Sequence, residues 1–499
     1  MRTVPRLALR DFAGRHTPAY ARRPFFSNRA YASIATSKFG QPLHETHPHI
    51  LKAGELLKLI SVTPGITAVE YHERRARLAK SLPRGGVAIL PSADIKTRSG
   101  AVFYEFHQQP DFFYLTGFVE PEALAVIDIA REESELGYTF HLFVRPKDDH
   151  AEIWDGARSG LDAAKDVFNA DESHDINRVS SILPEIVQGS EVVHTDALRP
   201  NRSSSSLSRL LGRETNPIES SLQSLLKAEK VKSLRPLMNQ LRVTKSEAEI
   251  SNMRRAGKLS GRAFTEAMRK PYKLEKDLWT DIGHGFRSSG LSGEAYVPVI
   301  AGGTNGLSIH YVRNDDVLHQ GQLVLVDAGG AHGGYITDIT RTWPVDGKFS
   351  QAQKDLYNMV LNVQRSCISM CREDASTTLD ALHRIAGNGL QDGLRSLGFD
   401  MATDEFGQAM DILFPHHVGH HVGLDVHDAP GYSRSEWLKE GQCVTMEPGI
   451  YVPDDDRWPS HFRGMAIRIE DSICVTKEHP LVLTTEAVKE VDDIEALRN

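Results

Sequence analysis

The chain has 499 residues, of which 40% are hydrophobic and 25% charged, and its formal net charge is −8. This composition is typical of a globular protein with more than one domain, and it excludes a wholly disordered, collagen-like or disulfide-scaffold protein. No apolar run is long enough to predict a membrane-spanning helix, and the net negative charge argues against a general nucleic-acid binder. The cysteines form no CxxC pair, which favours free thiols in a reducing compartment.

Residues 1–31 differ from the rest of the chain. They contain seven arginines, no lysine and a single acid, Asp11, which gives a net charge of +6. An arginine-rich, acid-poor leader predicts a mitochondrial transit peptide, with a disordered basic tail as the alternative. The leader ends in Arg29-Ala30-Tyr31-Ala32-Ser33. This resembles a site that the matrix processing peptidase cuts two residues after arginine, so we predict cleavage after Ala30 and then removal of Tyr31.

The pattern becomes globular at about residue 67. Apolar runs at 87–90, 123–127 and 140–144 predict buried strands, and an amphipathic pattern at 69–78 predicts a helix. Alternating helices and strands indicate an α/β domain. We expect a serine-rich loop at 200–208 and then a connector, so the predicted domains are residues 67–240 and 241–499.

The second half begins with a helix signal. Thr244-Lys245-Ser246-Glu247 is a capping-box pattern that predicts a helix through about Met268. Further helices are expected near 351–372 and 377–396. Between them, Gly-rich turns and short strands carry nearly all of the residues with catalytic chemistry.

Two aspartates lie on the first pair of these strands. Asp327 ends the run 323–327, and Asp338 interrupts the strand 335–342 on the face shared with Ile336 and Thr340. A carboxylate among apolar neighbours is costly unless it is paired or binds a cation. The alternative is that Asp327 caps a turn and Asp338 forms a salt bridge.

A histidine cluster and two further acids follow. Five histidines lie between residues 416 and 427, where glycines disfavour a regular helix; some of the five are expected to be bystanders, and the residues alone nominate His417 and His421 as these. Glu447 meets a Pro-Gly turn, and Glu470 shares a strand face with Arg468, although an exposed turn acid and a surface ion pair are the alternatives. Jointly, two aspartates, two glutamates and one histidine suit a pair of divalent metals bridged by carboxylates.

These blocks carry a family resemblance. Two aspartates with ten residues between them, then HxxxH…H, MEPG and RxE, resemble the aminopeptidase P and prolidase branch of the pita-bread metallopeptidases. The resemblance covers residues 67–495 and includes 98–100 and 111–121 in the first half. It implies an α/β (α+β) protein with an N-terminal aminopeptidase P-type α/β domain and a C-terminal pita-bread catalytic domain.

The resemblance also implies the site. Asp327 would chelate one metal, Asp338 and Glu470 would bridge, and His420 with Glu447 would complete the second metal, which makes His417 a bystander. The implied catalytic residues are Glu447 as proton shuttle, His310 near the scissile bond, His416 and His427 around the tetrahedral intermediate, and Arg468 beside the last ligand. Two divalent ions are expected, and the resemblance favours Mn²⁺.

The predicted function combines the leader with this site. We expect a mitochondrial metalloaminopeptidase, in the matrix or on the matrix face of the inner membrane, that removes one N-terminal Tyr, Phe or Leu from imported proteins already trimmed by the matrix processing peptidase. Its partners would be these N-termini, and the resemblance implies a homo-oligomer formed through the N-terminal domain. The alternatives are a general Xaa-Pro aminopeptidase and, with lost ligands, a non-enzymatic pita-bread binding protein.

Overall fold

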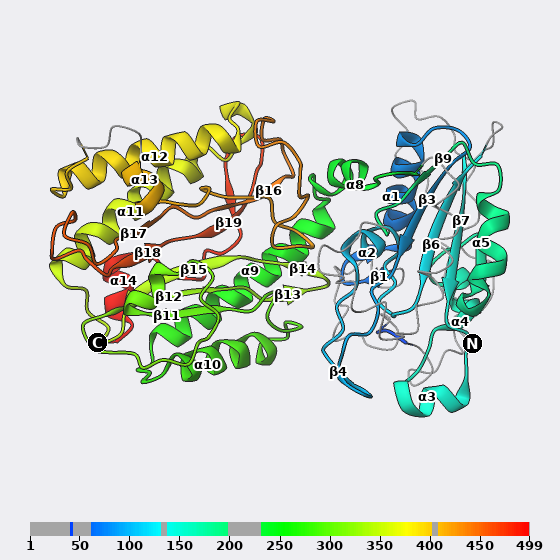
Figure 1. Ribbon diagram of the computed structural model, residues 1–499, viewed down its shortest axis with the longest axis horizontal. Coiled ribbons are helices and arrows are strands. Elements are labelled where there is room, and N and C mark those ends of the chain that lie inside the picture. Colours follow the sequence, from blue (N-terminus) through cyan, green and yellow to red (C-terminus); the bar gives the residue numbers. More distant parts are fainter. Residues whose placement is uncertain (1–39, 43–60, 131–136, 198–230, 402–407, 499) are drawn as a thin grey trace, which may run out of the picture.

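The computed structural model describes residues 40–42, 61–130, 137–197, 231–401 and 408–498. The predicted transit peptide and the serine-rich loop lie outside these ranges. The described chain forms two lobes, the first coloured blue to cyan and the second green to red, with helix α8 (Arg235–Arg242) between them (Figure 1). The predicted join at 240/241 falls inside α8.

The N-terminal lobe is a mixed sheet with helices on both faces. The strand order is β10-β9-β3-β6-β7-β8, and β3 pairs antiparallel with β6 and parallel with β9. Along β3, Ala88 and Leu90 pack in the cluster that contains α1 and α2, whereas Val87 and Ile89 pack with α5. The predicted buried strands and the predicted helix are therefore confirmed. The elements are α1 (Ala68–Ser81), β3 (Gly86–Pro91), α2 (Pro110–Thr116), β6 (Leu124–Ile129), β7 (Tyr138–Val144), α3 (Asp149–Asp155), α4 (Gly160–Asp166), β8 (Glu172–Asp175), α5 (Val179–Val187), β9 (Val192–His194) and β10 (Val231–Lys232).

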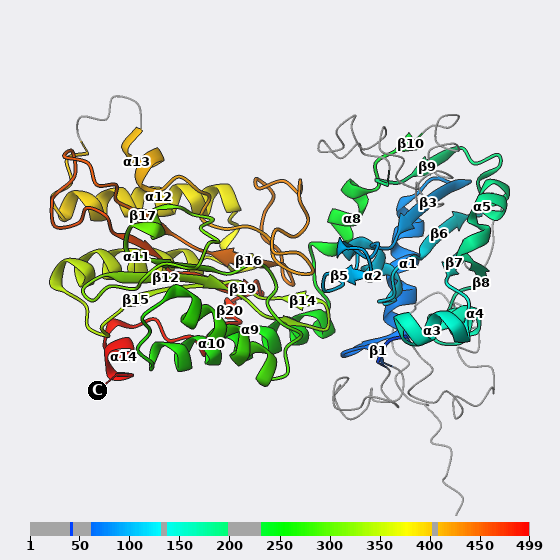
Figure 2. The same ribbon diagram turned by 60° about the horizontal axis from the view of Figure 1, so that its bottom comes forward.

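The C-terminal lobe places small sheets between two pairs of helices, which both views show (Figures 1 and 2). The sheets follow the orders β11-β12-β15, β16-β19-β20 and β17-β18. The helices are α9 (Glu247–Met268), α10 (Glu275–Ser288), α11 (Gln351–Ser369) and α12 (Leu379–Ser396), and α13 (Gln408–Leu413) and α14 (Val491–Ala496) are shorter. The strands are β11 (Val299–Gly302), β12 (Leu323–Ala328), β13 (Ala331–His332), β14 (Tyr335–Ile336), β15 (Ile339–Pro344), β16 (Cys443–Met446), β17 (Gly449–Tyr451), β18 (Ala466–Arg468), β19 (Asp471–Cys474) and β20 (Leu481–Val482).

Two local predictions in this lobe need correction. Helix α9 starts two residues later than predicted, because Ser246 is the N-cap and forms a capping box with Glu249, while Thr244 stays extended in a bridge to Gln442. Asp338 does not interrupt a continuous strand but lies in the break between β14 and β15. Its backbone N–H and C=O both bond to the hydroxyl of Ser472, at 3.0 and 2.9 Å, instead of a ladder partner.

Buried charges join the lobes. Arg74 on α1 is 0% exposed, and its guanidinium bonds to Glu70 at 2.6 Å and pairs with Glu249 of α9 at 3.4 Å. The hydroxyl of Tyr335 donates to Glu249 at 2.7 Å. Around these groups, one apolar cluster continues from α1 and α2 into β14 and β16. In the described ranges, no helix is long and apolar enough to cross a bilayer.

We expect Arg74→Met to destabilise the protein by about 3–5 kcal/mol, because it leaves Glu249 buried without its cation. Urea unfolding measures this change in the free energy of unfolding. The control is Arg269→Met, which removes an exposed partner of Glu266 and should cost less than about 0.5 kcal/mol. Equal effects of the two substitutions would contradict the importance of the buried pair.

Candidate metal centre

The acids of the candidate site lie at the ends of strands that are far apart in the sequence. Asp327 lies at the end of β12 and faces Thr340 of β15 across the ladder. Glu447 lies between β16 and β17, and Glu470 lies between β18 and β19. The Glu470 N–H donates to the Thr340 carbonyl at 3.0 Å, which ties the two sheets together at the site.

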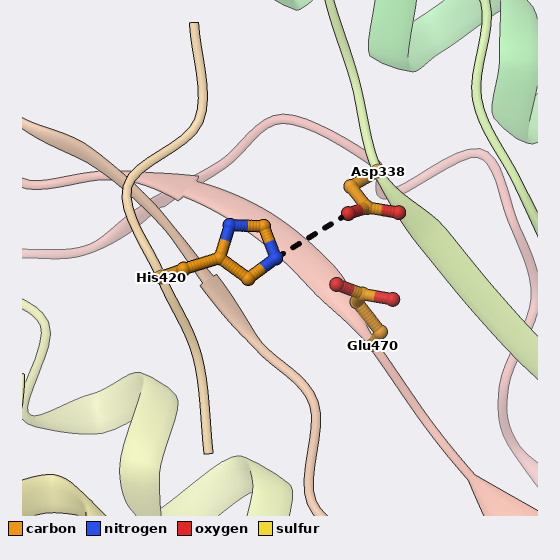
Figure 3. Close-up of side chains that lie close together, drawn as sticks. All are labelled: Asp338, His420 and Glu470. Carbon is orange, nitrogen blue, oxygen red and sulfur yellow. Dashed lines mark ion pairs between the residues drawn. The ribbon is translucent and has the colours of Figure 1, made fainter. Parts of the chain in front are cut away.

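Three side chains form its centre. Asp338, His420 and Glu470 offer ligand atoms that all lie within 4.8 Å of one another. Figure 3 shows the His420 ring directed toward Asp338, with the Glu470 carboxylate beside them. The Nε2 atom of His420 lies 3.6 Å from Asp338 and 3.4 Å from Glu447. This imidazole and three of the predicted acids therefore lie together.

The orientation of His420 is determined by its other nitrogen. Its Nδ1 lies 3.0 Å from the carbonyl of His421, so an Nδ1–H donor leaves the Nε2 lone pair directed at the carboxylates. Histidines that bind metals are oriented in this way. Burial alone would lower the pKa of His420, but hydrogen bonding to Asp338 and the charges of Glu447 and Asp338 raise that pKa to about 9.

The fifth predicted ligand is held from two sides. One oxygen of Asp327 accepts a 2.7 Å hydrogen bond from the Tyr296 hydroxyl, and the other accepts from Arg468 at 2.6 Å. The Tyr296 hydroxyl also donates to Asp338, so it links two of the acids. Burial raises the pKa of Asp327, an effect that Arg468 opposes and Asp338 reinforces.

The site holds more negative charge than its own cations neutralise. Burial raises the pKa of Glu447 to about 7 and that of Glu470 well above its usual range. For Asp338, burial opposes ionisation, but the hydrogen bond and charge of His420 lower the pKa. Glu470 accepts from the Thr340 hydroxyl at 2.6 Å, while its buried Oε1 has no hydrogen-bond partner among the described residues. An acceptor left open beside other carboxylates and an imidazole nitrogen fits divalent cations.

The remaining predicted residues lie around this centre. The ring of His427 lies edge-on to His420 at 4.5 Å and is exposed on its outer side. The Nε2 atom of His416 lies 2.9 Å from the Tyr451 hydroxyl, and its Nδ1 lies 3.8 Å from Glu447. His310 is exposed and close enough to lower the pKa of His427, after the larger effects of burial and His420.

The two histidines that we expect to be bystanders contact other residues. His417 is exposed and contacts the ring of His383, and the buried His421 ring packs against Tyr432. His420 N–H bonds to the Thr445 hydroxyl at 3.1 Å, and Thr445 N–H bonds to the His420 carbonyl at 2.8 Å. These bonds hold the segment beside β16 with His420 directed inward.

Sequence reasoning missed two tyrosines. Tyr296 bridges Asp327 and Asp338, and Tyr451 bonds to both His416 and Arg468, the latter at 2.7 Å. Tyr451 lies two residues after the MEPG block and was available as a candidate. Tyr296 belongs to none of the motifs, and no pattern around it indicates its role.

Comparisons with known proteins agree with this arrangement. Residues 251–477 match metallopeptidase family M24, and residues 71–194 match the N-terminal domain of aminopeptidase P. Intermediate cleaving peptidase 55 of Saccharomyces cerevisiae is 44% identical over 94% of this chain and 90% of its own length. Xaa-Pro aminopeptidase 3 of Homo sapiens is 36% identical over 93% of this chain and 91% of its own. A crystal structure of the yeast Icp55 without its N-terminal 58 residues superposes with a TM-score of 0.80 at 41% identity, covering 88% of this chain and 99% of that one.

The fold and the site thus define a metal-dependent aminopeptidase. More narrowly, the chain belongs to metallopeptidase family M24 and carries the N-terminal domain of aminopeptidase P. The predicted fold, with a pita-bread catalytic domain, is confirmed, and the family requires divalent metal ions.

We expect Glu447 and His420 to stabilise the metal-free protein less as pH rises. A group whose pKa is higher in the folded protein than in the unfolded chain binds more protons when folded, so its contribution to stability is lost as pH rises between the two values. For Glu447 this range runs from 4.5 to about 7, and for His420 from 6.5 to about 9. Buried histidines whose pKa is lowered, such as His416 and His421, act in the opposite direction below pH 6.5. Calorimetry of metal-free protein should therefore show the Tm falling with pH relative to that of a variant without the titrating group, and saturating divalent cation should reduce this relative fall.

The control for this prediction is Glu447→Gln, which has no carboxyl group to titrate. Its Tm should fall less steeply with pH than that of the wild type between pH 4.5 and about 7. If the two metal-free proteins gave the same slope, the buried Glu447 would not be the source of the effect.

Proposed function

We propose that this protein removes a single N-terminal Tyr, Phe or Leu from imported mitochondrial proteins after their first cleavage by the matrix processing peptidase. The observation that carries the peptidase chemistry is the cluster of Asp338, His420 and Glu470, whose ligand atoms lie within 4.8 Å of one another. The substrate assignment is supported by 44% identity to a yeast protein named an intermediate cleaving peptidase. It is also supported by the chain's own Arg29-Ala30-Tyr31-Ala32-Ser33, which has the form of such a substrate.

The protein is mitochondrial, as its arginine-rich leader predicts. The Arabidopsis thaliana relative, 35% identical over 96% of this chain and 91% of its own length, is named a mitochondrial intermediate cleaving peptidase. We place the enzyme in the matrix or on the matrix face of the inner membrane, where trimmed N-termini become available.

The ligand assignment that we propose uses all five predicted residues. Asp327 would chelate one ion, Asp338 and Glu470 would lie between the two ions, and His420 with Glu447 would complete the second. The ions would supply an activated water near neutral pH and polarise the substrate carbonyl. We propose Mn²⁺, a choice that the carboxylate-rich donor set permits.

The protein's own residues would move the protons and hold the substrate. Glu447 lies within 3.4 Å of His420 and would take a proton from the attacking water and pass it to the leaving nitrogen. His427 and His310 lie at the exposed rim, where they would donate to the developing oxyanion. Burial and the nearby Arg468 lower the pKa of His416 to about 3, so this imidazole stays neutral against Tyr451. Arg468 would hold Asp327 and Tyr451 in place.

We also propose that the protein associates with itself through the N-terminal lobe. Helix α3 buries none of its residues, and Ile153 and Trp154 on it are each 78% exposed. Adjacent large apolar side chains on a surface helix are typical of a protein contact.

A second candidate function is a general Xaa-Pro aminopeptidase. The observation that favours it is the human relative, which is 36% identical over 93% of this chain and is named an Xaa-Pro aminopeptidase. A non-enzymatic role predicts that the ligands are lost, but all five residues are present in the sequence, and three of them, Asp338, His420 and Glu470, offer ligand atoms within 4.8 Å of one another.

We expect Asp338→Ala and Glu470→Ala each to reduce kcat/KM by more than about a hundredfold, because the loss of groups that merely orient ligands already costs 10–100-fold. Purified variants should keep the wild-type circular dichroism and bind less metal by elemental analysis. His417→Ala is the matched control, since His417 is exposed in the same cluster, and it should stay within about twofold of wild type. Equal losses in Asp338→Ala and His417→Ala would contradict the ligand assignment.

The substrate proposal is tested with two peptides that differ at one position. Purified mature enzyme should release Tyr from a peptide beginning Tyr-Ala-Ser at a rate at least comparable to that for Tyr-Pro-Ser. Turnover of the proline peptide alone would support the general Xaa-Pro alternative. The N-terminus of the mature protein from cells gives an independent measurement: Ala32 agrees with the proposal, and a persistent Tyr31 contradicts it.

A further inference from the structure

One buried carboxylate closes the loop that carries His310. This segment, the His310 loop, comprises residues 303–316 and begins in the short helix η4 (Gly303–Leu307) after β11. Glu275, the first residue of α10, lies beneath it and is 0% exposed. The loop itself is open to solvent at His310, so its position depends on what holds it from below.

Glu275 accepts four hydrogen bonds from the loop and its ends. Its Oε1 accepts from the Gly302 N–H at 2.9 Å and from the Asn305 side-chain amide at 3.0 Å. Its Oε2 accepts from the Tyr311 hydroxyl at 2.8 Å and from the Asp316 N–H at 2.9 Å. Because Gly302 and Asp316 lie at opposite ends of the loop, one side chain joins both ends, and through Tyr311 it also holds the residue next to His310.

The backbone around this group is fixed independently of it. The Glu275 N–H donates to the Asp316 carbonyl at 3.0 Å, and the Leu318 N–H donates to the Lys273 carbonyl at 2.9 Å. The side chain of Asn314 accepts from the Ile300 N–H at 2.9 Å and donates to the Pro298 carbonyl at 2.8 Å. These bonds hold the chain ends. Glu275 reaches from the ends to the middle of the loop, and the Asn305 side chain adds longer bonds to the Tyr311 hydroxyl at 3.3 Å and to Asp316 at 3.2 Å.

The four contacts require a carboxylate rather than an amide. A glutamine at this position would present one oxygen and one NH₂ group to the same four donors. With its oxygen toward Gly302, its NH₂ would face the Asp316 N–H; turned over, its NH₂ would face the Gly302 N–H. Tyr311 and Asn305 can reverse their roles, but a backbone N–H cannot, so either orientation leaves one backbone donor unpaired, the buried Gly302 N–H or the partly buried Asp316 N–H.

We propose that Glu275 is a positioning residue for catalysis, which holds His310 at the distance from the substrate carbonyl that the reaction needs. The inference rests on the proposed function in one respect, the role of His310 near the scissile bond. Glu275 itself does not touch the substrate and acts only through the loop.

The test is a double-mutant cycle with Glu275→Gln and His310→Ala, assayed on whichever peptide the wild type cleaves. We expect Glu275→Gln to lower kcat/KM about tenfold or more, mostly through kcat, because an unpaired buried donor displaces the loop. In the His310→Ala background the same substitution should change kcat/KM by less than about twofold. Multiplicative losses in the double variant would overturn the proposal, as would a His310→Ala variant with wild-type activity.

A matched control separates positioning from a general loss of stability. Val360→Ala on α11 removes buried apolar volume from the same lobe without touching the loop, and it should lower the Tm while leaving kcat nearly unchanged. If Glu275→Gln behaved like Val360→Ala, the carboxylate would be merely structural. Should Glu275→Gln fail to fold, Tyr311→Phe takes its place in the cycle, with a smaller loss of kcat/KM that must also vanish in the His310→Ala background.

Hydrogen exchange gives a readout that needs no substrate. Glu275→Gln should speed amide exchange at whichever of Gly302 and Asp316 faces its NH₂ group, while the amides of α11 keep wild-type protection. Unchanged protection at both amides would contradict the proposal even if activity fell. The substrate assignment can fail in the peptide comparison without changing this result, so the two proposals are judged separately.

Discussion

The buried negative charge at the centre of the C-terminal lobe is the constraint on which the rest of the structure depends. Asp338, Glu447 and Glu470 surround the His420 imidazole, Asp327 is paired with Arg468, and the neighbouring protein cations are Arg468 and a protonated His420. Burial, and after it the neighbouring carboxylates, raise the pKa values of Glu447 and Glu470, so these acids resist ionisation without further positive charge. Divalent ions supply that charge. The same cations therefore serve the catalytic chemistry of an M24 peptidase and neutralise the buried carboxylates.

The fold satisfies this constraint by taking each acid from a different strand end. Glu470 is tied to Thr340 of β15 through its backbone and its side chain, and Glu447 N–H bonds to the Val418 carbonyl at 2.8 Å. Neutral hydroxyl donors from Tyr296 and Thr340 complete the set, and they orient the carboxylates without adding charge. Main-chain pairing therefore fixes the positions of these side chains.

Much of this could be predicted from sequence, and the failures have physical causes. The runs 87–90, 123–127 and 140–144 became buried strands because both faces of the N-terminal sheet are covered. The acids of the site were predictable because they sit in short blocks whose order is specific to the family. The residues alone did not single out His420 among the remaining histidines, since it points inward through its backbone pairing with Thr445. Tyr296 carried no signal, because its role arises from two aspartates that lie more than 30 residues away in the chain.

The buried ion pairs between the two lobes bear on whether the lobes can be produced separately and on which substitutions they tolerate. Arg242 in α8 is bonded to Asp111 of the first lobe at 2.7 Å and, on the other side, to Asp425 and Asp428, which flank His427. Lys245 shares Asp428 at 2.9 Å within the same buried group. If the catalytic lobe were expressed alone, Arg242 and the apolar surface of β14 would be exposed to water beside the active site. We therefore expect the catalytic lobe to need the first lobe for its stability, and substitutions at the contacts between the lobes to affect catalysis as well as folding.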